Sequence, residues 1–230
     1  MTVWDRPEPP NRPVPLDRER IVAAAVALAD EGGLDAVSLR KVAARLEVGP
    51  MRLYGYISTK EDLFDLMVDE VQAEILPVER PGDWRDALST LAHRTRRTVL
   101  RHEWLADLLG GRPTLGPNGL AVAESTLSAL DGLADVDTVM RAVETVSAYY
   151  NGAIRREITN LRAERATGLS ERDWQREQGP HLTRMLATGR FPALSKAVYD
   201  GTDTDAETSF ATGLDWVLDG VAARLAPPPK

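Results

Sequence analysis

Residues 37–60 read VSLRKVAARLEVGPMRLYGYISTK, and this stretch decides the fold. Between residues 38 and 60 a single anion, Glu47, stands among five cations: Arg40, Lys41, Arg45, Arg52 and Lys60. The whole chain of 230 residues carries a formal net charge of −7, so this cluster reverses the charge locally. Positive charge on a compact helical segment attracts the phosphates of a nucleic-acid duplex.

The stretch is typical of two short helices joined by a tight turn, the helix-turn-helix. An apolar stripe with helical spacing predicts the first helix: Leu39, Val42, Ala43 and Leu46. Ser38 can cap its start, Gly49 permits the turn, and Pro50 suits the first position of the second helix. The second helix, residues 50–56, should bury Leu53 and the following Ile57, and expose Met51, Arg52, Tyr54, Gly55 and Tyr56.

The order of these features resembles the TetR family of one-component transcriptional regulators. Residues 16–32 resemble the first helix of that family, and residues 53–60 resemble its recognition helix and the start of its fourth helix. Glu47 stands where the family usually has glycine, which raises the question of strain in the turn. The resemblance implies a three-helix DNA-binding head at the N-terminus, followed by a larger helical body that binds ligand and dimerises.

Helical periodicity continues to the end of the chain without strand-like alternation, which predicts an all-α fold. We expect a disordered Pro/Arg-rich arm over residues 1–15, a helix-turn-helix DNA-binding domain over 16–62, and a helical ligand-binding and dimerisation domain over 63–226. The helices predicted after the head are 62–75, 83–102, 104–109, 118–133, 137–166, 170–188, 192–199 and 206–225.

The N-terminal arm has two possible roles. Its prolines prevent it from forming a core element, so it is either an inert tail or an arm that enters the DNA minor groove. The inert tail is the preferred interpretation; the second rests on Arg6 and Arg12, because arginine binds in narrow minor grooves.

Residue types assign roles within the head. Arg52 is expected to read guanine in the major groove, because a guanidinium matches the two acceptors of that base. Other polar side chains are expected to hold phosphates. The full predicted DNA-contacting set is Ser38, Arg40, Pro50, Met51, Arg52, Tyr54, Gly55, Tyr56 and Lys60. Tyr56 alternatively covers the core of the head, and Arg45 is either solvated or directed at a phosphate.

The resemblance also implies a homodimer, in which residues 143–154 and 210–221 pair with their copies. The predicted interface is Val143, Val146, Phe210, Gly213, Leu214, Val217 and Val221. Gly213 could alternatively serve close packing of helices within one chain instead of between copies. A symmetric dimer would present two heads about 34–36 Å apart to a palindromic operator on double-stranded DNA.

Position in the resemblance gives a candidate effector pocket. Its residues are Leu91, Thr95, Trp104, Leu108, Arg112, Tyr149 and Asn151. Core packing or a surface position is an equally good interpretation of each. A small molecule of unknown identity bound there would shift the helix that begins at Lys60 and release the operator. Repression is the usual behaviour of the family, and activation is left open.

Composition argues against other classes of protein. The chain has no cysteine, which excludes disulfides, thiolate catalysis and cysteine-based zinc sites. His93, His102 and His181 lack metal-binding spacing, and no phosphate-binding or nucleophile motif is present. We therefore expect no metal, no cofactor and no enzyme activity. The rival classes are an enzyme with a hidden site and an interaction protein without DNA binding. No signal peptide or membrane-spanning run is apparent, so we expect a cytoplasmic protein without a membrane partner.

Overall fold

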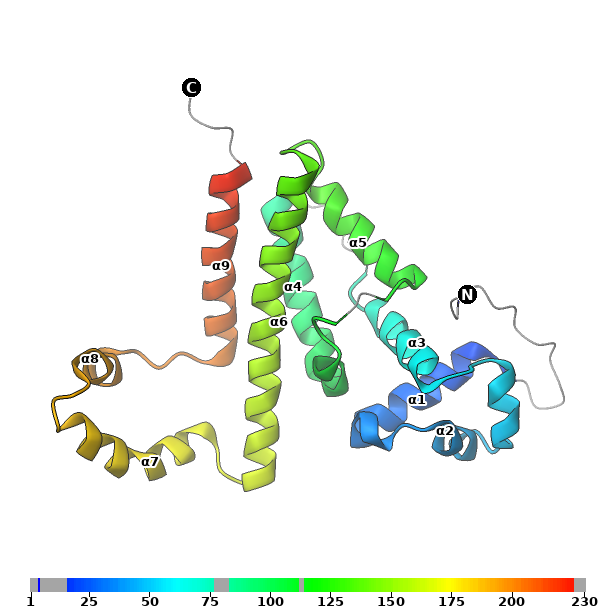
Figure 1. Ribbon diagram of the computed structural model, residues 1–230, viewed down its shortest axis with the longest axis horizontal. Coiled ribbons are helices and arrows are strands. Elements are labelled where there is room, and N and C mark those ends of the chain that lie inside the picture. The colour runs from blue at the N-terminus through cyan, green and yellow to red at the C-terminus, as the bar shows by residue number, and fades with distance from the viewer. Residues whose placement is uncertain (1–3, 5–15, 77–82, 112–113, 226–230) are drawn as a thin grey trace.

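The computed structural model describes residue 4 and residues 16–76, 83–111 and 114–225. Over these ranges the chain forms helices and turns and no strand, which confirms the predicted all-α fold. Figure 1 shows a small head made of α1, α2 and α3 beside a body built along the long helix α6.

The head combines three α-helices with two short 3₁₀ segments. In chain order they are α1 (Arg18–Gly32), η2 (Leu34–Ala36), α2 (Leu39–Arg45), η3 (Pro50–Gly55) and α3 (Lys60–Gln72). A side-chain oxygen of Asp17, Ser38 or Thr59 caps the start of each α-helix by accepting a backbone N–H three residues on. The inner faces meet in a core of fully buried side chains: Ile21, Ala25, Val42, Ala43, Leu53, Ile57, Leu63 and Met67.

The body surrounds α6. Its elements are α4 (Trp84–Arg101), η4 (Glu103–Asp107), α5 (Pro117–Leu130), α6 (Val136–Thr167), α7 (Glu171–Leu186), α8 (Pro192–Asp200) and α9 (Ala206–Leu225). Helix α6 lies between α9 on one side and α4 and α5 on the other, whereas α7 and α8 extend away from the bundle (Figure 1). These helices follow the predicted ranges to within a few residues, because Gly, Pro and capping residues mark most of their ends.

Helix α3 belongs to both the head and the body. Leu63 and Met67 on α3 are fully buried in the head core. Two residues after Met67, Asp69 contacts the start of α5 in the body, where its carboxylate accepts the N–H of Gly119 at 2.9 Å. The domain boundary expected between residues 62 and 63 therefore falls inside a single helix.

A hydrogen-bonded cluster, here called the junction cluster (Asp30, Glu74, His102 and Trp104), fixes the head to the body. His102 Nδ1 lies 2.8 Å from Asp30 Oδ1, and its Nε2 lies 3.1 Å from Glu74 Oε1. Trp104 Nε1 donates to the same Asp30 oxygen at 2.8 Å. His102 and Trp104 are both buried, and the two carboxylates that they contact are partly open to solvent, so the end of α1 is held against the end of α4 at the edge of the core.

Candidate nucleic-acid interface and effector-binding body

The turn between α2 and η3 adopts an unusual backbone conformation at Glu47. Its φ is 55°, and it is the one non-glycine residue with positive φ among the residues described. The chain reverses there, and Val48 N–H donates back to the carbonyl of Ala43 at 3.0 Å. A left-handed residue at this point explains why glycine would suit the position, since a side chain disfavours that conformation.

Segment η3 presents an exposed outer surface and a buried inner one. Met51 is 80% exposed and Tyr54 is 52% exposed, whereas Leu53 is fully buried, as expected. Arg52 is partly exposed. The other predicted DNA contacts on this surface are exposed or partly exposed: Ser38, Arg40, Pro50, Gly55 and Lys60. Eight of the nine predicted DNA contacts are therefore accessible to a duplex.

Tyr56 is the exception, and its predicted exposure is wrong. The side chain is only 7% exposed, and its hydroxyl donates to the carbonyl of Leu16 at 2.5 Å. The alternative interpretation, in which Tyr56 covers the core of the head, fits this geometry. The cause is the tight 3₁₀ winding of η3 and the bend after it, which turn Tyr56 inward together with Ile57.

Arg45 is held by an ion pair within the head. Its two terminal nitrogens donate to the two carboxylate oxygens of Glu31 at 2.9 and 2.8 Å. The neighbouring guanidinium lowers the pKa of Glu31 by hydrogen bonding. Arg45 therefore links α2 to α1 while it remains exposed to solvent, which fits the solvated role considered from the sequence.

The predicted effector residues do not gather at one place. Leu91 and Thr95 are buried on α4, and Asn151 lies on α6 with its Oδ1 atom buried and without a hydrogen-bond partner. Trp104 belongs instead to the junction cluster. Tyr149 points toward α9, where its hydroxyl donates to the carbonyl of Phe210 at 2.9 Å. Leu108 is a partly buried core residue, and Arg112 lies outside the described residues.

The predicted dimer stripe is largely used inside one chain. Val146, Phe210, Leu214 and Val221 are buried where α6 packs against α9 of the same chain, so their assignment to an interface between copies is corrected. Gly213 also serves this contact, because an added Cβ would collide with the Tyr149 ring. Val143 and Val217 are partly exposed beside the same seam.

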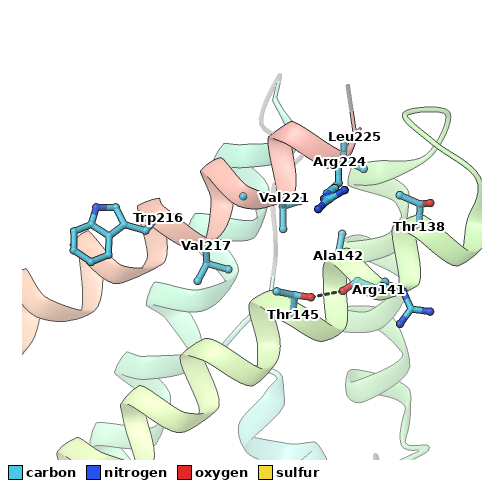
Figure 2. A pocket seen from close by; sticks show the side chains of 10 residues that line it. Thr138, Arg141, Ala142, Thr145, Trp216, Val217, Val221, Arg224 and Leu225 are labelled. Carbon is cyan, nitrogen blue, oxygen red and sulfur yellow. Dashed lines mark hydrogen bonds between the residues drawn. The ribbon is translucent and has the colours of Figure 1, made fainter. Parts of the chain in front are cut away.

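An open groove runs along the outer side of the α6–α9 seam. Figure 2 shows α9 along one side of the groove, α6 along the other, and Trp216 projecting outward from α9. Trp216 is 73% exposed, and the groove has a volume of about 640 Å³. Its lining is Thr138, Arg141, Ala142, Thr145, Trp216, Val217, Gly220, Val221, Arg224 and Leu225.

Two further features bear on the class of protein. Over the described part of the chain, His, Asp and Glu side chains form no group of three that could hold a metal ion. No helix in that part is long and apolar enough to cross a membrane.

Comparison with known proteins gives consistent matches. Residues 21–67 match the family model for bacterial regulatory proteins of the tetR family, and residues 76–225 match the model for the tetracyclin repressor-like C-terminal domain. The HTH-type transcriptional repressor DrrR1 of Streptomyces coeruleorubidus is 39% identical over 235 residues, covering 97% of this chain and 84% of that protein. An HTH-type transcriptional regulator of Saccharopolyspora erythraea is 38% identical over 231 residues, covering 96% and 91%. The solved structure of Streptomyces coelicolor ActR in complex with actinorhodin has a TM-score of 0.78 at 28% identity, covering 91% of this chain and 96% of ActR.

An exposed helix-turn-helix on a larger helical body defines a DNA-binding regulator. The matched models and relatives place it more narrowly: the chain belongs to the TetR family of transcriptional regulators. It is therefore a transcriptional regulator, which confirms the class of function predicted from its sequence. The family is one of regulators and not of enzymes.

Sequence reasoning missed the junction cluster. Asp30, Glu74 and His102 lie on three different segments, and no spacing pattern in the chain connects them. The one sequence feature that pointed to this cluster is the run His102-Glu103-Trp104, in which an ionisable ring lies next to an acidic residue and a tryptophan. That signal does not indicate which partners the ring would find.

Proposed function

We propose that the chain binds a palindromic operator as a homodimer, with the exposed surface of η3 in the major groove. The supporting observation is this exposed surface of η3, which carries Met51 and Tyr54, together with the exposed cations Arg40 on α2 and Lys60 on α3. A basic surface with one element turned outward suits both phosphate attraction and base reading. Since the regulator must reach the chromosome, we place it in the cytoplasm.

Operator binding is tested with a duplex enriched from a random pool by the chain itself. In fluorescence anisotropy, Arg52→Ala should cost about 1–3 kcal/mol and relax specificity at one position. Lys60→Ala should instead weaken all sequences alike and reduce the salt slope by about one. Absence of an enriched sequence and of duplex binding at every salt concentration would refute the proposal.

The dimer is proposed to form on the outer side of the α6–α9 seam. The buried faces of these two helices already pack against each other, so a second copy can contact only their outer faces. Trp216, Val217 and Gly220 lie on that outer face beside the groove (Figure 2). An exposed tryptophan beside apolar and small residues is typical of a surface that a partner covers.

The effector is proposed to bind in the interior of the body near Asn151. An unpaired carbonyl oxygen buried away from water costs about 1–3 kcal/mol, and a ligand donor would remove that cost. Thr95, buried on α4, adds a hydroxyl group as a second polar group on the inner side of the body. Binding would release the operator only if the ligand favours one head arrangement over the other.

Asn151→Leu provides a test of this site. A leucine of similar size removes the unpaired oxygen, so the free protein should unfold at an equal or higher temperature. A thermal-shift screen, with actinorhodin as the first probe because ActR is known in complex with it, identifies a stabilising compound. That compound should stabilise the leucine variant less than the original chain. Asn160→Leu, at an exposed position on the same helix, is the control; an equal shift in both variants would contradict the assignment.

A further inference from the structure

Trp4 packs against the place where the head meets the body. Its side chain is partly buried against the hydrophobic core. A Cβ added to Gly116, directly before α5, would lie 2.6 Å from Trp4 Cζ2 and would also collide with the Asp69 carboxylate. The backbone of Gly116 has φ −75° and ψ 165°, which any residue adopts. Glycine is therefore required there for space, and Trp4 is one of the two groups that occupy it.

The contact beneath Trp4 joins α3 to α5. Asp69, 5% exposed, accepts the N–H of Gly119 at 2.9 Å and a side-chain N–H of Asn118 at 3.3 Å. One turn further along α3, Gln72 Oε1 accepts the hydroxyl of Thr114 at 3.2 Å. A carboxylate at a helix N-terminus satisfies free N–H groups and complements the helix dipole. Because the first half of α3 lies in the head core, this contact transmits any movement of α5 to the head.

We propose that Trp4 is a positioning residue of the α3–α5 contact. Its ring covers the Asp69 carboxylate and excludes water from the hydrogen bonds to the start of α5, which strengthens them. Trp4 therefore acts at the joint between head and body, and not in the DNA minor groove. The packing of Trp4 stands on the contacts above, and its effect on regulation rests on the proposed function.

Hydrogen exchange of the full chain tests the packing directly. Trp4→Ala should speed exchange of the amides at the start of α5, residues 118–121, by about tenfold, because solvent then reaches the Asp69 contact. Exchange in α9 should not change. Trp174→Ala, at an exposed tryptophan on α7, is the matched control and should leave α5 unaltered. Equal protection of α5 in both variants would overturn the proposal.

Gly116→Ala approaches the same contact from the other side. The added methyl group must displace the Trp4 ring or the Asp69 carboxylate, so exchange at the start of α5 should rise as it does in Trp4→Ala. Gly179→Ala, in α7, adds a methyl group where no atom lies within 4 Å and should have no effect. Unchanged exchange in a folded Gly116→Ala variant would also overturn the proposal; if this variant does not fold, the Trp4→Ala result decides.

Operator titrations separate this proposal from a DNA-contacting arm. Replacing both Arg6 and Arg12 by alanine should keep the salt dependence of operator affinity, because only an arm that lies on DNA would lose phosphate contacts and reduce the salt slope. A changed salt slope would place the tract on DNA and contradict the inference. If the original chain binds no duplex, the proposed function fails, but the exchange experiment still decides the role of Trp4 in the contact.

Discussion

At the scale of single residues, Glu47 shows how local conformation and side-chain identity can disagree. Positive φ costs a residue with a Cβ about 1–2 kcal/mol, and glycine avoids that cost at the expense of some unfolded-state entropy. The side chain of Glu47 is exposed, so nothing in the core depends on it. The turn is therefore maintained by its neighbours, α2 and η3.

Glu47→Gly should raise the free energy of unfolding by about 0.5–1 kcal/mol, measured by urea denaturation. The gain comes from relief of the left-handed conformation. Glu47→Ala keeps the Cβ and serves as the control, so it should give little or no gain. If alanine stabilises as much as glycine, loss of the negative charge would be the cause instead.

Tyr150, beside Asn151 on α6, gives a prediction about pH. Burial raises the pKa of Tyr150 to about 12. In the unfolded chain a tyrosine ionises near pH 10, so between about pH 10 and 12 the unfolded state loses a proton that the folded state keeps. The stability that depends on neutral Tyr150 is present below pH 10 and falls as the pH rises through this window.

Tyr150→Phe should remove this alkaline loss, which is of the order of 2 kcal/mol at pH 12. Urea denaturation at several pH values between 9 and about 12 measures it. Tyr199→Phe, at an exposed tyrosine on α8, is the matched control. A loss that persists in Tyr150→Phe would assign the titration to another group.

At the scale of elements, the junction cluster shows how polar contacts at the ends of helices fix their relative placement. Asp30 near the end of α1 accepts from two buried donors on the segment that follows α4. Glu74, just after α3, lies 3.1 Å from the other ring nitrogen of His102, Nε2. Its carboxylate also forms an ion pair with Arg101 at 2.9 Å. Three helix ends therefore meet at one polar site that fixes their relative placement.

Asp30→Ala should lower the free energy of unfolding by about 2–3 kcal/mol, because it leaves buried donors of His102 and Trp104 without an acceptor. Asp35→Ala, at an exposed carboxylate in η2, should change it by less than about 0.5 kcal/mol. Urea denaturation of both variants checks the difference. Equal effects of the two substitutions would mean that the cluster contributes little.

Periodicity and caps predicted which elements exist, and they did so for physical reasons. Ser38 caps its helix as expected, since its hydroxyl accepts the nearest free backbone N–H. Contacts between distant segments could not be predicted in this way. An apolar stripe predicts that a helix face is buried, but it does not identify the element that buries it. Leu214 and Val221 are buried by α6 of their own chain. The same limit applies to Tyr56, whose partner Leu16 lies forty residues earlier.

At the scale of the whole molecule, one helix pair presents two different faces. The inner faces of α6 and α9 close the body, and their outer faces border the groove beside Trp216 (Figure 2). Two-fold pairing across this face would fix the separation of two heads, on which recognition of two half-sites depends. Assembly and operator affinity should therefore change together.

Trp216→Glu should shift the chain from dimer to monomer in analytical ultracentrifugation and lower operator affinity, because it replaces the apolar ring that a second copy would cover by a charge that must lose its water on burial. Leu120→Glu, at an exposed apolar residue on α5, is the matched control and should keep both properties. A dimer that survives Trp216→Glu would place the interface elsewhere on the chain.

The shared helix α3 also limits how hybrid regulators can be assembled from relatives. A chimera recombined between residues 62 and 63 would join a foreign helix-turn-helix to Leu63 and Met67, which fill the core of the original head. A crossover after residue 76 would keep that core together. The residue that replaces Asp69 would then have to accept the backbone N–H at the start of this chain's α5. A chimera that takes its operator specificity from a relative therefore needs that relative's α3 together with a start of α5 that can bond to it.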